Sequence, residues 1–492
     1  MNKYRTLFTF LLIIKGLLGL ALILVAGIGL GPDEAQYWTW SQHLDLGYYS
    51  KPPGIAWQIA LGTLFWGNTE LGVRFLSLIL GTIIPCIIYA LGLKCKLTER
   101  AAFWSALTFA FSPLGFLASF FAITDVGMLL FWAIACLALA AHASLIQVGF
   151  WIMLGALFKW PIYLLWIPIL FFPKISKKGL ITGFLISLLG LIPSLYWNIA
   201  HDWATFQHVF NTVQGGHGPK HGNILEFIGS QAALISPIFF LLMLVALIQL
   251  FRKRHQASLE LKFCGFVTLL FFFSYLLASI FMKIQGNWGL FAYPTGFIVL
   301  GWYASEGIAL KWLKAGLALA IVLLFCVFMI PTIQSQGLFG NIPISYRINP
   351  FKHNLGWTEL EKVLTEVGYR PDQHILIGDK YQTTSILSFY SPGQKRAYFL
   401  NLHGNRKNQF SYWPSIPWGS SGYYVVTENE PHWKKDMDRL NEMEAELKPY
   451  FKEVRFVTAA PLFKSYGKAV KVAFIFFCSE FNGNEPKGSE LY

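Results

Sequence analysis

Gly31-Pro-Asp-Glu-Ala-Gln-Tyr-Trp38, continued by Tyr48-Tyr-Ser-Lys-Pro-Pro-Gly-Ile-Ala-Trp57, is the stretch that decides how this chain is organised. It follows the first apolar run and opens with two adjacent carboxylates, Asp33 and Glu34. Prolines interrupt helices, and aromatic side chains with one polar end favour the membrane headgroup region. The pattern predicts a folded loop on a membrane surface that presents two acids. Capping of a following helix explains the acids equally well, since Asp and Glu favour a first helical turn.

The composition is that of a membrane protein. Of 492 residues, 55% are hydrophobic and only 13% are charged, whereas soluble proteins carry roughly 25% charged residues. The formal net charge is +13, which is also typical of proteins that bind nucleic acid. Its distribution along the chain argues against nucleic acid and in favour of a lipid bilayer.

Fourteen of the twenty Lys and Arg residues before residue 334 fall in five short clusters between apolar runs. The clusters are Lys3/Arg5, Lys94/Lys96/Arg100, Lys174/Lys177/Lys178, Arg252/Lys253/Arg254/Lys262 and Lys311/Lys314. The loops at the opposite ends of the runs are nearly free of Lys and Arg. Under the positive-inside rule, this pattern places all five clusters in the cytosol.

The apolar runs predict an α-helical polytopic membrane protein. Runs of about 20 residues, which is enough to cross a bilayer, lie near residues 8–30, 71–93, 101–119, 126–146, 180–198, 224–250, 263–282, 288–304 and 314–333. A further stretch, 149–172, is broken by Lys159-Trp-Pro161 and predicts two short helices that meet at Lys159. With these two helices, the total is about 11 membrane helices. Only an even number of helices in this stretch keeps all the basic clusters on one face of the membrane.

With this topology, most acids of the first 333 residues fall on the outer face. They are Asp33, Glu34, Asp45, Glu70, Asp125, Asp202 and Glu226. Acids contribute little to topology, so their asymmetry predicts an outward-facing polar site. Asp125 lies between two apolar runs, where a functional acid and a helix N-cap are equally good interpretations. Lys159 lies inside an apolar stretch, which favours an anionic partner over simple snorkelling.

Other polar residues of this half give weaker signals. Arg74 opens an apolar run, and such a residue is more often a headgroup anchor than a ligand. Four histidines lie in a Gly-rich outer loop without the close spacing of a metal site; they are His201, His208, His217 and His221. We expect a flexible polar loop there, and a bound divalent metal is the open alternative.

The composition changes after about residue 334, which predicts two domains: residues 1–333 in the membrane and 334–492 as a soluble α/β domain on the outer face. Expected strands are His374–Gly378, Ala397–Leu400, Gly422–Val426, Val454–Val457 and Val470–Phe477, and expected helices are Thr358–Val367, Tyr381–Tyr390 and Lys435–Leu447. No Gly-rich phosphate loop is visible in the sequence, so no nucleotide site is predicted.

These motifs resemble one family. Asp33-Glu-Ala-Gln-Tyr-Trp-Thr-Trp-Ser41, followed by Leu44–Trp57 and Arg74, resembles the bacterial polyprenyl-phosphate-sugar glycosyltransferases. These are the protein-mannosyltransferase-like and aminoarabinose-transferase-like enzymes of glycosyltransferase family 39/83 type, which have the GT-C fold. Further matches are Thr124-Asp125, Lys159, Asn287-Trp288, Ala292-Tyr-Pro294 and Gly404-Asn-Arg-Lys-Asn-Gln-Phe-Ser-Tyr-Trp413.

The resemblance implies transfer of a single sugar, with inversion, from a polyprenyl-phosphate donor to an extracytoplasmic acceptor such as lipid A or lipopolysaccharide, a glycan or a protein. It assigns the general base to Asp33, with Glu34 and Asp125 shaping the site or holding acceptor, sugar or a divalent metal. It implies cations at the donor phosphate, namely Lys51, Arg74 and Lys159. Substrate contacts are expected from Tyr48, Tyr49, Trp288 and Tyr293.

The resemblance also implies that the protein lies in the bacterial inner (plasma) membrane and is a monomer. It implies that the active site and the C-terminal domain are extracytoplasmic. Two other classes stay open. A ligase or polymerase of lipid-linked oligosaccharides shares the chemistry but transfers a chain. A transporter also buries charges in a multi-span protein, but it usually has internal repeats, and the sequence shows none between its halves.

Overall fold

The computed structural model describes residues 3–173, 175–213, 222–340, 343–430 and 437–486. The chain divides into two compact units, which we call unit 1 and unit 2. Unit 1 contains Met1–Leu22, Lys51–Gly62 and Arg74–Phe325, and unit 2 contains Ile23–Ser50, Thr63–Val73 and Cys326–Tyr492. A single domain boundary at residue 333 stays a prediction.

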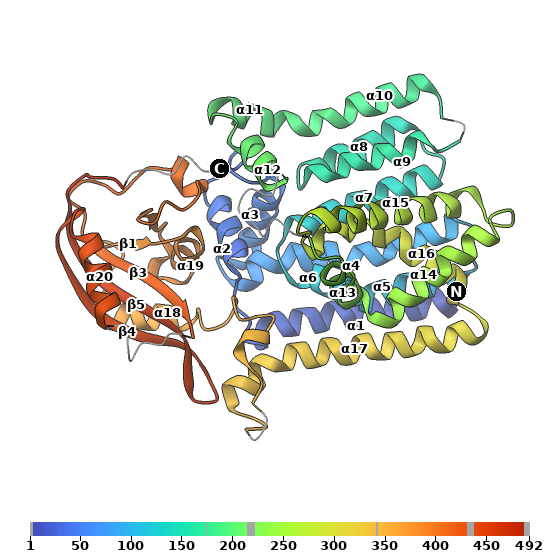
Figure 1. Cartoon of the computed structure of the whole chain (residues 1–492). Coiled ribbons are helices and arrows are strands. Elements are labelled where there is room, and N and C mark those ends of the chain that lie inside the picture. Colours follow the sequence, from blue (N-terminus) through green and yellow to red (C-terminus); the bar gives the residue numbers. More distant parts are fainter. Residues whose placement is uncertain (1–2, 174, 214–221, 341–342, 431–436, 487–492) are drawn as a thin grey trace. The chain divides into compact units, whose positions relative to one another are not determined.

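Unit 1 is built from helices (Figure 1). They are α1 (Lys3–Val25), α3 (Gly54–Trp66), α4 (Glu70–Lys94), α5 (Glu99–Phe111), α6 (Pro113–Phe120), α7 (Thr124–Ala140), α8 (Leu145–Ala156), η1 (Trp160–Leu165), α9 (Trp166–Leu170), α10 (Lys177–Leu188), η2 (Leu189–Leu191), α11 (Ile192–Ala200), α12 (Ala204–Val213), α13 (Ile224–Ile235), α14 (Pro237–Arg252), α15 (Leu259–Phe281), η3 (Gly286–Ala292), α16 (Tyr293–Ala304) and α17 (Gly307–Gln336). The division between the units falls within α1, α3, α4 and α17.

Most helices follow the predicted apolar runs, but the runs 101–119 and 224–250, each predicted as one span, are each divided into two helices. Five helices are long and apolar enough to cross a membrane, or up to seven spans if each of two bent pairs counts as one. The bent pairs are α5 with α6, which turn by 58°, and α13 with α14, which turn by 102°. The stretch around Lys159 is interrupted as predicted, because α8 ends at Ala156 and η1 begins at Trp160. The protein is therefore a multi-pass membrane protein, and the total of about 11 membrane helices stays a prediction.

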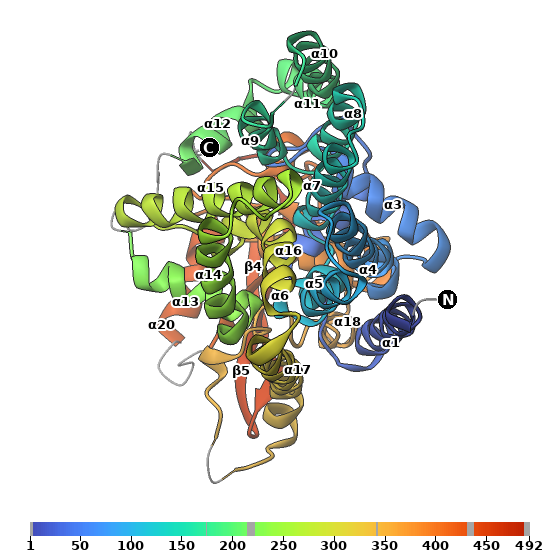
Figure 2. The same cartoon turned by 90° about the vertical axis from the view of Figure 1, so that its right-hand side faces the viewer.

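Small residues let some of these helices pack closely. α8 and α10 lie side by side in two perpendicular views (Figures 1 and 2). A Cβ atom added to Gly149 of α8 would stand 2.1 Å from the carbonyl oxygen of Gly183 in α10. Glycine is therefore required at this crossing, as is common where membrane helices approach each other.

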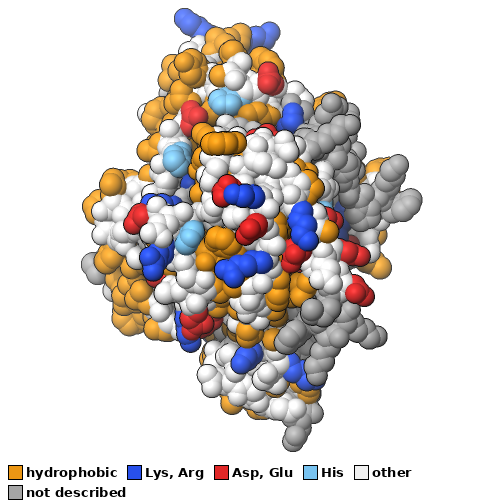
Figure 3. Space-filling model, turned by 90° about the vertical axis from the view of Figure 1, so that its left-hand side faces the viewer, with side chains coloured by type: hydrophobic (Ala, Val, Ile, Leu, Met, Phe, Trp, Pro, Cys, Tyr) orange, Lys and Arg blue, Asp and Glu red, His pale blue; other side chains and the backbone are white. Residues whose placement is uncertain are grey.

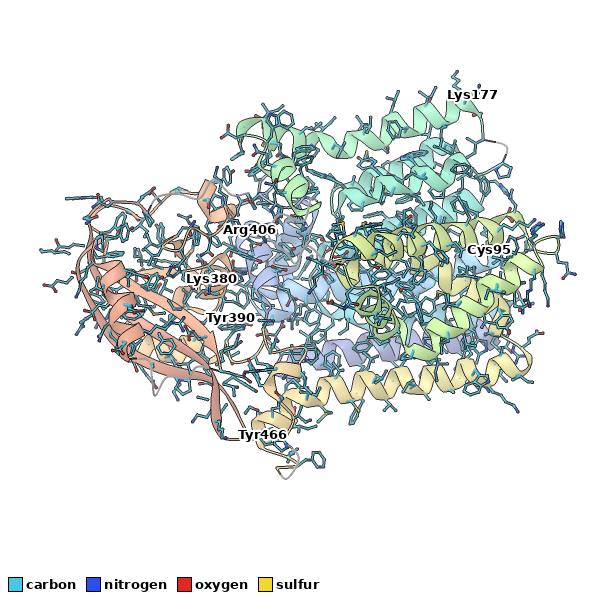
Figure 4. All side chains as sticks on the ribbon, viewed as in Figure 1. Cys95, Lys177, Lys380, Tyr390, Arg406 and Tyr466 are labelled. Carbon is cyan, nitrogen blue, oxygen red and sulfur yellow. The ribbon has the colours of Figure 1, made fainter. Side chains whose placement is uncertain are left out.

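Two of the basic clusters can be placed relative to each other within unit 1. Lys177, at the start of α10, lies at the same end of the helices as Cys95, which is flanked by Lys94 and Lys96 (Figure 4). α1 also begins at that end (Figure 1). This arrangement is what the positive-inside pattern predicts for loops on one side of a membrane.

Unit 2 contains a five-stranded sheet with the order β2-β1-β3-β5-β4. The strands are β1 (Ile375–Gly378), β2 (Tyr398–Phe399), β3 (Gly422–Asn429), β4 (Phe451–Ser465) and β5 (Lys468–Phe481). β2, β1 and β3 pair in parallel, whereas β5 pairs antiparallel with both β3 and β4. The other elements are α2 (Pro32–Ser41), η4 (Tyr346–Ile348), α18 (Glu359–Glu366), α19 (Tyr381–Tyr390), η5 (Pro392–Gln394), η6 (Gln409–Tyr412) and α20 (Met437–Leu447).

All five strands and all three helices predicted for the α/β region are present, and α19 has the predicted bounds. The long hairpin of β4 and β5 extends beyond both predicted strands. On the face of the molecule shown in Figure 3, basic, acidic and hydrophobic side chains are interspersed. Charge of one sign does not dominate the described part of that face.

Two predicted outer loops contain more helix than expected. Residues 31–70 include α2 and α3, because Pro32 occupies the first turn of α2 and Pro52-Pro53 precede α3. Proline is compatible with a helix start, where its missing N–H has no intrahelical partner. The histidine loop was also predicted wrongly in part: His208 is buried on α12, and His201 stacks on Trp197 with ring centroids 4.0 Å apart. His217 and His221 lie outside the described residues.

Candidate functional site

The two adjacent acids have different surroundings. Gly31, in extended conformation, is the N-cap of α2, and Glu34 accepts a hydrogen bond from the Gly31 backbone N–H at 2.9 Å. The Glu34 side chain is buried, with 2% exposed. Glu34 therefore satisfies a backbone donor at the helix start, as the capping interpretation requires. Asp33 is exposed and does not fill this position.

α2 is held by the C-terminal part of unit 2. Tyr390, at the end of α19, donates to Glu70 at 2.5 Å and accepts from the Leu30 backbone N–H at 2.6 Å (Figure 4). Trp38 packs edge-on against Phe389 with ring centroids 5.0 Å apart. These contacts fix the entrance and the body of α2, so the Asp33 backbone has a defined position in this unit.

The side chain of Asp33 contacts α19 as well. The Tyr381 hydroxyl donates to Oδ1 of Asp33 at 3.3 Å, and Tyr381 also forms a side-chain hydrogen bond with Arg406. Burial and the nearby Asp33 charge raise the pKa of Tyr381, so the hydroxyl stays protonated and donates. The contact links the first acid of the motif to the motif that contains Arg406, which Figure 4 labels on the same unit.

Tyr48 and Tyr49 are buried in unit 2. Tyr48 stacks on Trp40 at a centroid distance of 4.5 Å, and its hydroxyl donates to the carbonyl oxygens of Trp40 and His43. The Tyr49 backbone N–H donates to the Gln409 side chain at 2.7 Å. Both tyrosines thus shape the turn after α2, and direct substrate contact by either stays a prediction.

Unit 1 brings three other predicted or motif residues together. The Lys159 ammonium lies 2.7 Å from Oδ1 of Asp125, and the Asn287 amide donates to Oδ2 of Asp125 at 3.4 Å. The Lys159 and Asp125 side chains are 16% and 6% exposed. Asp125 lies in the first turn of α7, Lys159 just before η1 and Asn287 in η3. The anionic partner expected for Lys159 is therefore present, and it is a carboxylate of the chain itself.

The other predicted residues of unit 1 have varied surroundings. Arg74 is fully buried, with its guanidinium carbon 4.8 Å from the ring centroid of Phe120. Lys51 lies in the turn before α3 and is partly buried. Tyr293 is in the core and donates to Gln231 at 2.6 Å, whereas Trp288 is partly buried on η3. Their contacts with donor phosphate or substrate stay predictions.

The described residues were also compared with the requirements of a divalent metal site. Within the described ranges, no group of three or more His, Cys, Asp or Glu residues could hold a metal ion. Metal sites for Mg²⁺ or Ca²⁺ draw mainly on carboxylate and carbonyl oxygens.

Two contacts could not be predicted from the sequence. Tyr381 was assigned to a helix correctly, but its contact with Asp33 joins residues 348 positions apart. Asn287 was noted as part of a motif, yet its hydrogen bond to Asp125 also depends on the tertiary fold. Only the resemblance of motifs drew attention to the segments that contain Asn287 and Arg406.

Comparison with known proteins gives consistent results. The family described as dolichyl-phosphate-mannose-protein mannosyltransferase matches residues 50–197. The chain is 32% identical over 316 residues to the lipid A galacturonosyltransferase RgtD of Rhizobium johnstonii, covering 59% of this chain and 63% of the relative. It is 26% identical over 289 residues to the undecaprenyl phosphate-alpha-4-amino-4-deoxy-L-arabinose arabinosyl transferase 2 of Proteus mirabilis, covering 49% and 50%. The matches thus span about half to two thirds of these relatives.

The fold is shared over nearly the whole chain. The crystal structure of ArnT from Cupriavidus metallidurans bound to undecaprenyl phosphate aligns with a TM-score of 0.65 and 12% identity, covering 96% of this chain and 98% of ArnT. The apo structure of the same protein gives a TM-score of 0.62 and 13% identity, covering 95% and 98%. The chain therefore has the ArnT-like GT-C fold.

Proposed function

We propose that this protein transfers a single sugar from a polyprenyl-phosphate donor to a glycolipid acceptor of the lipid A type, with inversion. The names of two relatives support this choice: one is a lipid A galacturonosyltransferase and the other an undecaprenyl-phosphate aminoarabinose transferase. A glycan or a protein is the alternative acceptor, and either would be modified by the same chemistry.

The observation that carries the proposal is the separation of roles between the two adjacent acids. Glu34 is buried and bonded to the start of its own helix, whereas Asp33 is exposed and hydrogen-bonded to Tyr381. An exposed carboxylate on a fixed backbone can accept a proton from an approaching hydroxyl. We assign Asp33 as general base and Glu34 as the residue that holds the turn before it.

The proposed reaction is a displacement in one step. Asp33 takes the proton of the acceptor hydroxyl, and the acceptor oxygen forms a bond to the anomeric carbon of the donor sugar. The bond between that carbon and the phosphate oxygen breaks, and its electron pair leaves with the polyprenyl phosphate. Cations stabilise such a leaving group, and we assign this role to Lys51, Arg74 and Lys159. Lys159 would act together with Asp125, which already balances its charge.

We further propose that the protein resides in the bacterial inner membrane as a monomer, with unit 2 on the extracytoplasmic side. The basic clusters support this orientation, since Lys and Arg are retained on the cytosolic side. A donor linked to a lipid suits that compartment because the sugar and its activating phosphate arrive together in the bilayer.

Substrate contacts are expected from Tyr48, Tyr49, Trp288 and Tyr293.

The test is reconstitution of the purified protein with polyprenyl-phosphate sugars and lipid A. We expect release of polyprenyl phosphate and an acceptor mass increased by one sugar. Asp33→Asn serves as the matched inactive control. An acceptor that gains a chain of sugars would indicate a ligase or polymerase, and donor consumption without any transfer would contradict the proposal.

A further inference from the structure

Arg396, just before β2, has unusual surroundings for a surface cation. Its guanidinium carbon lies 4.8 Å from the Tyr398 ring centroid and 5.7 Å from that of Trp413. Its Nη2 donates to the carbonyl oxygen of Pro414 at 3.0 Å. The side chain is partly buried. Two aromatic rings and a backbone oxygen therefore hold the guanidinium in a defined orientation.

This cation has no carboxylate partner among the residues that the structure describes. The neighbouring Lys395 does, since its ammonium lies 2.8 Å from Asp372. Arg347 and Arg439 of the same unit are also paired, with Glu430 and Glu428. Partial burial lowers the pKa of Arg396, but an arginine remains charged at neutral pH. A partly desolvated charge without an anion is costly, and an incoming oxyanion would remove that cost.

A second polar group, His43, lies next to Trp413. The His43 ring is 5.2 Å from the Trp413 ring, centroid to centroid. Burial and the Arg396 charge lower the pKa of His43, so its imidazole is neutral at neutral pH and offers one donor and one acceptor. The Tyr398 hydroxyl oxygen accepts a hydrogen bond from Arg396 and can still donate its own proton. Arg396, His43 and Tyr398 thus combine a cation with groups that can bind sugar hydroxyls.

We propose that Arg396, with His43 and Tyr398, binds the anionic group of a sugar, and that this sugar is the phosphorylated headgroup of the acceptor. The assignment to the acceptor rests on the proposed function, because a lipid A acceptor carries phosphate directly on its sugar rings. The planar guanidinium matches two phosphate oxygens at once, which a lysine in its place would not do. Trp413 acts as the support that orients Arg396 and His43.

Direct binding to the purified full-length protein tests the site without turnover. The probes are N-acetylglucosamine 1-phosphate, uncharged N-acetylglucosamine and inorganic phosphate, titrated by calorimetry. We expect the sugar phosphate to bind most tightly and Arg396→Gln to weaken it by about tenfold or more. Lys395→Gln is the matched control, because it removes the adjacent, already paired cation, and should leave binding unchanged. Equal binding by wild type and Arg396→Gln would overturn the site.

Kinetics then identify the source of the anion. With lipid A as acceptor, Arg396→Gln should raise the acceptor KM by about tenfold while donor KM stays constant. With dephosphorylated lipid A, the variant and wild type should be alike. A raised donor KM would overturn the acceptor assignment, and a lowered melting temperature with normal binding and KM would reduce Arg396 to a structural support. Sugar-phosphate binding that persists without any sugar transfer would instead contradict the proposed function alone.

Discussion

The Lys159 ammonium and the Asp125 carboxylate form an ion pair at 2.7 Å, with Asn287 donating to the second carboxylate oxygen. Lys159 lies just before η1, Asp125 in α7 and Asn287 in η3. These contacts therefore connect separate parts of unit 1. Both side chains are mostly buried, and each charge is neutralised by the other. Lys159 can therefore contribute positive charge to a donor phosphate only as part of this pair.

Breaking one side of the pair should destabilise the protein. Lys159→Met leaves Asp125 as an uncompensated, nearly buried charge, and we expect a loss of about 3–5 kcal/mol in unfolding free energy. The double variant Lys159→Met/Asp125→Asn should recover most of that loss. Thermal unfolding in detergent measures both, and a double variant no more stable than Lys159→Met would contradict the pairing.

The same variants separate structure from donor binding. The stable double variant should still turn over donor poorly if Lys159 and Asp125 act together at the phosphate, and Lys159→Arg should retain some activity although it is not an equivalent hydrogen-bonder. Normal donor turnover by the double variant would restrict Lys159 to a structural role.

The two adjacent acids should respond differently to removal of their charge. Asp33→Asn keeps the size of the side chain, and loss of the general base predicts a decrease of roughly 100- to 10,000-fold in sugar transfer without unfolding. Glu34→Gln keeps an oxygen that can accept from Gly31, so we expect a smaller loss of activity and about 1 kcal/mol or less of stability. Assays at saturating donor and acceptor, with melting curves, make the comparison. Wild-type turnover by Asp33→Asn would require another base.

Much of this architecture could be predicted because it follows from local pattern. Most apolar runs match the helices, although two predicted single spans are bent pairs, and α19 was predicted at its observed bounds, Tyr381–Tyr390. α3 was missed, and a helix at α2 was only one of two open interpretations, because their prolines were interpreted as helix breakers, whereas Pro32 occupies a helix start and Pro52-Pro53 precede one. The contact of Tyr381 with Asp33 lies beyond sequence analysis, since no periodicity relates residues 348 positions apart.

The orientation in the membrane can be tested with fused reporters. A reporter placed after Lys178 or Arg254 should be cytosolic, because each follows a basic cluster, and one placed after residue 340 should be extracytoplasmic. Two reporter enzymes give complementary readouts, one that is active only in the oxidising outer compartment and one that is active only in the cytosol. A cytosolic signal after residue 340 would contradict both the orientation and the use of a lipid-linked donor.

The buried Lys471 predicts a pH dependence of stability. Its ammonium lies 2.6 Å from the Leu355 carbonyl oxygen and 3.7 Å from the Trp357 ring centroid, and burial lowers the pKa of Lys471 to about 7. The unfolded chain keeps a pKa of about 10.4 for lysine, so between these values it binds more protons than the folded chain. The contribution of Lys471 to stability therefore rises with pH across that window.

Lys471→Met removes this titration, and it provides the measurement. The melting temperature of wild type minus that of Lys471→Met should be more positive at about pH 9 than at about pH 6. The variant also loses the contact with Trp357, but that loss alone gives the same difference at both pH values. A difference that does not change with pH would show that Lys471 has an ordinary pKa.

Tyr381 should act as a positioning residue for Asp33. Its hydroxyl donates to the Asp33 carboxylate at 3.3 Å, and a hydrogen bond of this kind favours the charged form of the acceptor. Tyr381→Phe removes the hydroxyl alone, and we expect kcat to fall by about tenfold, which corresponds to one hydrogen bond. Because the base would then be protonated more readily, the acid limb of the profile of kcat against pH should move to higher pH. Tyr369→Phe, which removes a tyrosine hydroxyl elsewhere in unit 2, is the matched control. A Tyr381→Phe enzyme with lower stability but an unshifted pH profile would mean that the hydroxyl supports only the packing of α19 against α2.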